Sequence, residues 1–109
     1  MFSLGSSKRL SLKQAHANLT SNTEIVVIDV RTSSEFYGNG HIKNAINIAV
    51  DQIGEQIEKI ITNKNTTIYL VCQSGTRSAM AYSILKRLSY THVFDLGSIV
   101  GWPAKLEFK

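Results

Sequence analysis

The sequence predicts an α/β fold with a central, mostly parallel sheet of about five strands, flanked by helices on both faces. Short apolar runs without polar alternation, typical of strands covered on both sides, alternate along the chain with segments whose apolar residues recur at helical spacing. In such folds the ligand site lies beyond the carboxyl ends of the strands. The length of 109 residues, with 43% hydrophobic residues and a single proline, predicts one domain over residues 1–109.

The expected strands are short β-branched or apolar runs, at residues 24–30, 45–48, 66–71 and 93–96. A first helix is expected after Ser11, which has capping-box spacing to Gln14. Two more helices are expected, one from Asp51 and one from about Ser78. Their inward faces are predicted from residues at helical spacing: Ile53, Ile57, Ile60 and Ile61, then Met80, Ala81, Ile84, Leu85 and Leu88. The polar segment 31–40 is interpreted as a loop that follows the first strand.

Charge and composition argue against several classes of protein. The 12 Lys and Arg against 8 Asp and Glu give a net charge of +4 without a basic tract, so no nucleic-acid partner is expected. The apolar runs are far shorter than the ~20 residues that cross a membrane, so no membrane span is expected. The first residues lack the basic-then-apolar order of a signal peptide, which predicts a cytoplasmic protein. The three histidines have no metal-ligand spacing, and neither a metal nor an organic cofactor is expected.

The only cysteine, Cys72, is the candidate nucleophile because it ends a predicted buried strand and begins a short turn into a helix. Successive backbone N–H groups in such a turn form an anion-binding nest, and the positive pole of the helix stabilises a thiolate. Gly75 permits the tight curvature, while Arg77 is suited either to anchoring the loop on carboxylates or to holding an anionic substrate. The predicted site is Cys72 with the loop residues Gln73, Ser74, Gly75, Thr76, Arg77 and Ser78.

Three groups of residues, in this order, resemble the rhodanese-like domains, a family of single-cysteine sulfurtransferases. The first group is Asp29-Val30-Arg31, Glu35-Phe36, Gly40-His41-Ile42, Ala45 and Asn47. The second is the loop from Cys72 to Ser78, and the third is Val93-Phe94-Asp95-Leu96-Gly97 with Ile99 and Trp102. The chain departs from the family at Asn44, Ser89 and Ser98, where glycine is common. These departures concern turns and leave the expected chemistry intact.

The resemblance implies a transfer of sulfane sulfur through a Cys72 persulfide, from thiosulfate or a persulfide donor to cyanide or a thiol. Only four residues separate Cys72 from Arg77, one fewer than in the cysteine phosphatases of related fold. The shorter loop favours sulfur transfer over a phosphatase or arsenate reductase. A module that senses persulfide or redox state without turnover is a further alternative. Because the chain has no second cysteine, the acceptor must be an external thiol or a protein partner unless two chains meet.

Four other residues are predicted to support the site. Asp29 and Arg31 end a central strand, and Glu35 follows four residues after Arg31. We interpret these three as a structural charge network, because buried carboxylates need such partners. The resemblance gives His41 a structural place, and an already ionised thiol needs no general base.

Overall fold

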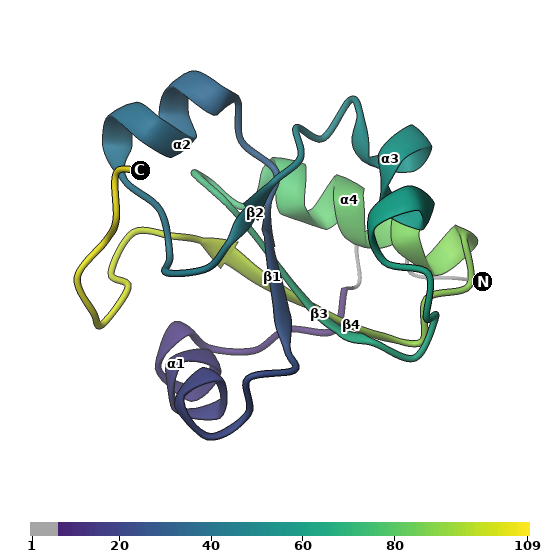
Figure 1. Ribbon diagram of the computed structural model, residues 1–109, viewed down its shortest axis with the longest axis horizontal. Helices are drawn as coiled ribbons and strands as arrows, with labels where there is room; N and C mark the ends of the chain where they lie inside the picture. The colour runs from purple at the N-terminus through teal and green to yellow at the C-terminus, as the bar shows by residue number, and fades with distance from the viewer. Residues whose placement is uncertain (1–6) are drawn as a thin grey trace.

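The computed structural model describes residues 7–109 and confirms the predicted α/β class (Figure 1). Its sheet contains the strands β1 (Val26–Asp29), β2 (Ile46–Asn47), β3 (Thr67–Cys72) and β4 (His92–Ser98). They lie in the order β2-β1-β3-β4, and every neighbouring pair is parallel. The two central strands, β1 and β3, therefore end at the same edge of the sheet, where Asp29 comes opposite Val71.

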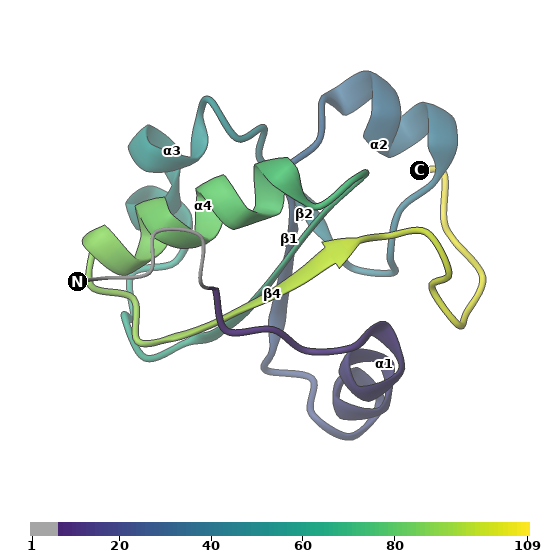
Figure 2. The same ribbon diagram turned by 180° about the vertical axis from the view of Figure 1, so that it is seen from behind.

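Four helices surround the sheet: α1 (Leu12–Ser21), α2 (Ser33–Asn39), α3 (Ile53–Ile60) and α4 (Thr76–Arg87). Figures 1 and 2 show α3 and α4 on one face of the sheet and α1 on the other. Each face has its own apolar core. One core includes Ile57 of α3, Leu85 of α4 and Cys72, and the other includes Ala15 of α1 and Tyr69 of β3. This division places the Cys72 side chain on the α4 face of the sheet.

The sheet has four strands, one near each of the four expected ranges, although about five strands were predicted. The N-terminal segment adds only a short pairing beside β4. Arg9 pairs in parallel with Asp95, whose N–H donates to the Lys8 carbonyl at 2.8 Å. The Leu10 N–H donates to the Asp95 carbonyl at 3.4 Å. This short pairing covers the outer edge of β4, but it ends where α1 begins and does not extend into a fifth strand.

The segment 31–40 contains helix α2, so the sequence-based interpretation of it as a loop was wrong. Thr32 caps the helix by accepting from the Glu35 N–H, and the Glu35 carboxylate accepts from the Thr32 N–H in return. This capping box was the available signal. The helix was missed because Phe36 is its one buried residue, which is too few to show apolar periodicity. Gly38 also lowers the helical propensity of the segment.

Two apolar residues predicted to face inward are exposed instead. Met80 is 53% exposed because the buried face of α4 is formed by Ser78, Ala81 and Leu85, and Met80 lies outside that face. Ile60 is 44% exposed at the end of α3. The first helix was predicted correctly: its cap, Ser11, accepts from the Gln14 N–H at 3.1 Å.

The two turns in which the family commonly has glycine keep a left-handed backbone in this chain. Asn44 has a φ of 65° and Ser89 a φ of 72°. Asparagine tolerates this region well, whereas serine adopts it at a cost. Ser89 directly follows the residue that caps the C-terminus of α4, a position where glycine is usual. Both substitutions therefore preserve the turn geometry.

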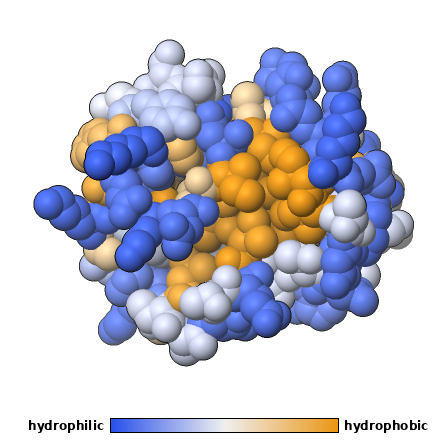
Figure 3. All heavy atoms as spheres, in the orientation of Figure 1, coloured by the Kyte–Doolittle hydropathy of each residue, from blue (hydrophilic) through white to orange (hydrophobic). Residues whose placement is uncertain are grey.

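Figure 3 shows an apolar surface in the middle of the face seen in Figure 1. Among residues 7–109, no helix has the length and apolar character needed to cross a membrane. The predictions for the first six residues lie outside the described part of the chain.

Candidate active site

Cys72 ends β3 at the edge of the sheet, and its thiol is fully buried beneath the loop that follows. The Gly75 N–H donates to the Cys72 Sγ, with the nitrogen 2.9 Å from the sulfur. Gly75 has a φ of 100°, a left-handed conformation that turns the chain directly from the loop into α4. The thiol thus lies under a curled backbone at the N-terminal, positive end of a helix, as expected from the sequence.

Ser78, in the first turn of α4, contacts the sulfur from the helix side. The Cys72 thiol donates to the Ser78 Oγ at 3.5 Å, and the Ser78 hydroxyl donates to the Gly75 carbonyl at 3.1 Å. The same carbonyl also accepts from the Ala79 N–H at 3.2 Å. If the thiol loses its proton, the Ser78 hydroxyl can rotate to donate to sulfur without leaving that carbonyl unpaired.

We predict that Ser78→Ala slows sulfur loading of Cys72 about tenfold, because the thiolate loses one charge-assisted hydrogen bond. The rate of persulfide formation with thiosulfate measures the effect. Ser83→Ala on the exposed side of α4 is the matched control and should retain the wild-type rate. Equal loading rates in the two variants would contradict a role for the Ser78 hydroxyl at the sulfur.

Arg77, in the first turn of α4, forms a two-pronged ion pair with Glu35 of α2. Its Nη1 lies 2.7 Å from Glu35 Oε1, and its Nη2 lies 2.9 Å from Oε2. The hydrogen bonds from Arg77, with a further one from the Thr32 backbone, lower the pKa of Glu35 from 4.5 to about 2. Of the two roles that the sequence left open for Arg77, this geometry favours anchoring the loop on a carboxylate.

This ion pair predicts an acid-dependent loss of stability. Because folding lowers the pKa of Glu35, the stabilisation is complete above pH 4.5 and is lost as the pH falls from there to about 2. At pH 7, we expect the free energy of unfolding of Glu35→Gln to be about 1 to 3 kcal/mol below that of wild type. The effect should be this large because the ion pair is only partly exposed, so water screens it incompletely. Urea titrations at pH 7 and pH 2 measure the difference, which should shrink at the lower pH. A constant difference would show that the Glu35 charge is not the cause.

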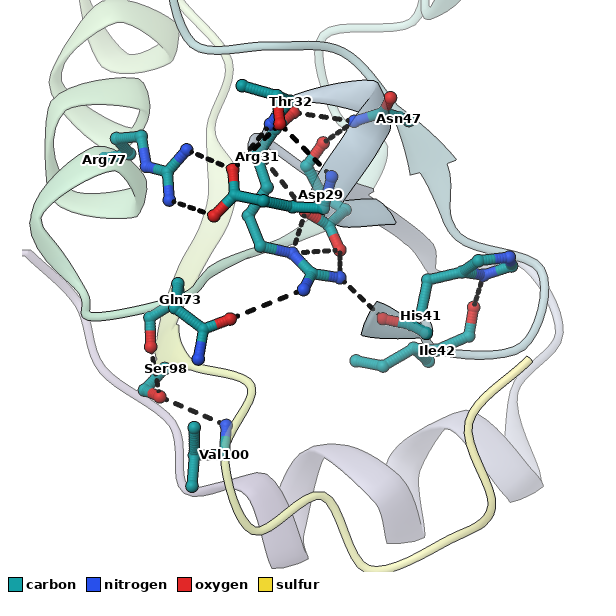
Figure 4. Close-up of polar contacts among 12 residues, drawn as sticks. Asp29, Arg31, Thr32, His41, Ile42, Asn47, Gln73, Arg77, Ser98 and Val100 are labelled. Carbon is teal, nitrogen blue, oxygen red and sulfur yellow. Dashed lines mark hydrogen bonds and ion pairs between the residues drawn. The ribbon is translucent and has the colours of Figure 1, made fainter. Parts of the chain in front are cut away.

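A second ion pair, Asp29 with Arg31, lies buried beneath the same edge of the sheet (Figure 4). The Arg31 Nη2 lies 2.7 Å from Asp29 Oδ2, and Nε lies 2.9 Å from Oδ1. Nη2 also donates to the Gly40 carbonyl at 2.8 Å, and Nη1 reaches the Gln73 carboxamide oxygen at 3.5 Å. The Asn47 carboxamide donates to the carbonyls of Asp29 and Arg31. The pair therefore connects the end of β1 with the cysteine loop.

The two ion pairs do not merge into the single charge network that the sequence suggested. Asp29 and Arg31 pair with each other, whereas Glu35 pairs with Arg77. Each pair holds one part of the loop. Arg31 contacts Gln73 near the beginning of the loop, and Glu35 holds Arg77 near the end of the loop.

Ser98 also holds the loop. From the sequence, it was noted only as a residue that stands where the family commonly has glycine. Its hydroxyl donates to the Gln73 carbonyl and accepts from the Val100 N–H at 3.1 Å (Figure 4). The Ile99 N–H donates to the Cys72 carbonyl at 2.8 Å. The signal that could have identified this role is the position of Ser98 at the end of a strand neighbouring Cys72.

His41 has a structural environment. Its ring stacks on Phe36, with 3.8 Å between ring centres and 3° between planes. Its two ring nitrogens form hydrogen bonds with the Ile42 and Lys109 carbonyls, each at 2.9 Å. These contacts tie α2 to the C-terminal segment, which also pairs with His41 through Glu107.

The remaining loop residues, Ser74 and Thr76, are exposed and uncharged. Within residues 7–109, no three His, Cys, Asp or Glu side chains form a group that could hold a metal ion. The site consists of a buried thiol, the Gly75 backbone N–H and a helix terminus, braced by two ion pairs. It has the features of a cysteine-dependent enzyme with an anion-binding loop.

Comparison with known proteins agrees with this class of site. The model of the rhodanese-like domain family matches residues 11–105. The thiosulfate sulfurtransferase PspE of Escherichia coli is 36% identical over 72 residues, covering 66% of this chain and 68% of that protein. The protein YqhL of Bacillus subtilis is 37% identical over 84 residues, and the chain covers 64% of it.

Solved structures show the same fold. A rhodanese-like domain protein from Staphylococcus aureus is 30% identical, with a TM-score of 0.76 and coverage of 94% of this chain and 98% of that one. A rhodanese from E. coli is 34% identical, with a TM-score of 0.66 and coverage of 72% and 94%. The chain belongs to the rhodanese-like domain family, and its relatives include sulfurtransferases.

Proposed function

We propose that this chain is a thiosulfate sulfurtransferase that carries sulfane sulfur as a persulfide on Cys72. The observation that supports this most directly is the buried thiol 2.9 Å from the Gly75 nitrogen in a loop with four residues between Cys72 and Arg77. The thiosulfate sulfurtransferase activity of the relative PspE supports the same reaction class. The rhodanese from E. coli was solved with anions, which fits a loop of N–H donors.

In the first step, the Cys72 thiolate attacks the outer sulfur of thiosulfate. A new sulfur–sulfur bond forms to Cys72, the sulfur–sulfur bond of thiosulfate breaks, and sulfite leaves with that electron pair. In the second step, cyanide or a thiolate attacks the outer sulfur of the persulfide, and the Cys72 thiolate leaves. Covalent capture divides one difficult transfer into two easier ones. The acceptor carries the sulfur away as thiocyanate or as a new persulfide.

The protein's contribution is electrostatic stabilisation of the charged sulfur. Arg77 is held by Glu35, so the Gly75 N–H and the positive end of α4 stabilise the sulfur instead. These dipoles are already oriented before the reaction and cost no reorganisation when charge moves onto the outer sulfur. Gln73, Ser74 and Thr76 contribute backbone to the loop and no side-chain charge.

The sulfur acceptor is proposed to be an external thiol, on a small molecule or a protein. Cys72 is the only cysteine in the sequence, so no second thiol of the same chain can resolve the persulfide. The cytoplasmic location expected from the sequence stays a prediction, and the reaction as written uses no metal or organic cofactor.

Steady-state kinetics with thiosulfate and cyanide test the proposal. We expect thiocyanate production with parallel double-reciprocal lines, because donor and acceptor react in separate steps. Hydrolysis of an aryl phosphate without thiocyanate production would favour the phosphatase alternative. A single sulfur loaded per chain without turnover would favour the sensing module, and no loading at all would overturn the proposal.

A further inference from the structure

A cavity of about 420 Å³ lies beside the cysteine loop, between that loop and the C-terminal segment. It is lined by Arg31, Asn39, Gln73, Val100, Trp102 and Leu106, among others. Figure 4 shows the Arg31 guanidinium and the Gln73 carboxamide directed toward each other, with the chain around Ser98 and Val100 below them. The reaction proposed above uses neither side chain, which leaves their role at this cavity open.

The Arg31 guanidinium has spare hydrogen-bonding capacity although it is 99% buried. Of its five N–H groups, those on Nε and Nη2 are taken by Asp29 and the Gly40 carbonyl. The two on Nη1 share one long contact, 3.5 Å to the Gln73 carboxamide oxygen. The Gln73 Nε2 donates to no group among residues 7–109. Arg31 and Gln73 therefore offer donors at the cavity that the protein itself leaves largely unused.

The other walls define what kind of molecule these donors suit. Val100, Trp102 and Leu106 provide apolar surface, and Val100 is 68% exposed at the rim. No Asp or Glu among residues 7–109 lines the cavity, so its hydrogen-bond donors favour an oxyanion as ligand. Its apolar walls favour a ligand in which that oxyanion is attached to an apolar group. Asp29 already neutralises Arg31, so a single negative charge fits better than a phosphate dianion.

We infer that this cavity binds a small organic monoanion, a carboxylate or sulfonate with an apolar body, through Arg31 Nη1 and Gln73 Nε2. The site lies apart from the Cys72 sulfur, because the Cys72 side chain packs in the core on the α4 face and does not line the cavity. Gln73 connects the two as the residue directly after Cys72. The inference goes beyond the proposed sulfur transfer, and its binding test does not depend on that reaction.

Titration of the full chain with benzoate, benzenesulfonate and the neutral benzamide tests the inference. Trp102 is the only tryptophan, so its fluorescence reports binding. We expect both anions to bind and benzamide to bind about tenfold more weakly, because it lacks the charge-assisted hydrogen bonds. Equal binding of benzoate and benzamide, or no binding of either anion, would overturn the inference.

Two exposed apolar residues offer a matched pair of variants. Val100→Asp places a negative charge at the rim of the cavity and should weaken benzoate binding about tenfold. Met80→Asp makes the same change on α4, where the side chain is 53% exposed, and should retain affinity within about twofold. If both variants bind benzoate like wild type, the ligand does not occupy this cavity.

Trp102 also lines a neighbouring cavity that includes Lys43, so the two cavities must be distinguished. Lys43→Glu should leave benzoate binding unchanged within about twofold, since Lys43 does not line the cavity at Arg31. In NMR titrations, the Trp102 indole and Gln73 carboxamide signals should shift together. Loss of binding in Lys43→Glu, or shifts confined to the backbone amides of residues 74–78, would assign the anion to another site and contradict the inference.

Discussion

Replacing Cys72 by serine is expected to lower thiocyanate production from thiosulfate and cyanide by at least about a thousandfold. A serine hydroxyl is neutral at physiological pH and cannot carry sulfane sulfur, although it fits beneath the Gly75 N–H. Initial rates of wild type and Cys72→Ser under the same conditions measure the effect.

The Cys72→Ser variant should fold normally, because one small buried side chain replaces another. Matching thermal unfolding curves, or a shift of a few degrees, will separate loss of chemistry from loss of fold. A folded Cys72→Ser protein with the wild-type rate would show that another group accepts the sulfur.

The largest effect on stability is expected at the buried ion pair below the loop. Asp29→Asn keeps the shape of the side chain but leaves the Arg31 guanidinium, 1% exposed, without its counter-charge. Breaking a buried pair in this way costs about 3 to 5 kcal/mol of unfolding free energy. Urea unfolding at pH 7 measures the loss, and Asp51→Asn at an exposed position is the control that should change little.

A double variant tests whether the orphaned charge is the cause. Asp29→Leu with Arg31→Met replaces the whole pair by apolar side chains, which is often close to neutral for folding. We expect the double variant to recover much of the stability lost in Asp29→Asn. If Asp29→Asn alone costs less than about 1 kcal/mol, the pair does not support the loop as described.

The position of Cys72, the proposed nucleophile, was predictable because its determinants are local. An apolar run ending in Cys72 and followed by Gly75 specifies a strand, a tight turn and a helix within a few residues. The parallel sheet then places that turn beside the end of β1, where Asp29 and Arg31 lie. Strand periodicity and connection rules were sufficient for this part of the site.

The partners of the charged residues were not predictable from spacing alone. Glu35 and Arg77 are 42 residues apart in sequence, and Arg31 and Gln73 are separated equally far. Such contacts depend on how the segments that follow β1 and β3 lie against each other, and α2, which carries Glu35, was missed. Its capping box of Thr32 and Glu35 was visible in the sequence, but one buried apolar residue gave too little helical periodicity.

At two turns, the backbone conformation is the expected one although the residue is unusual. Asn44 and Ser89 both have a left-handed backbone where glycine is common. Ser89 has a positive φ although residue propensity disfavours it. The turn is fixed by its surroundings: the Ser89 N–H donates to the Lys86 carbonyl, and the Tyr90 N–H donates to the Leu85 carbonyl. These hydrogen bonds at the C-terminus of α4 override the conformational preference of a single residue.

The most direct test of sulfur transfer through Cys72 is the intact mass of the protein after incubation with thiosulfate. We expect a gain of one sulfur atom per chain, located by digestion on the peptide that contains Cys72. Addition of cyanide should remove that sulfur as an equal amount of thiocyanate. An unchanged mass, or a sulfur that is retained in Cys72→Ser, would contradict the central claim.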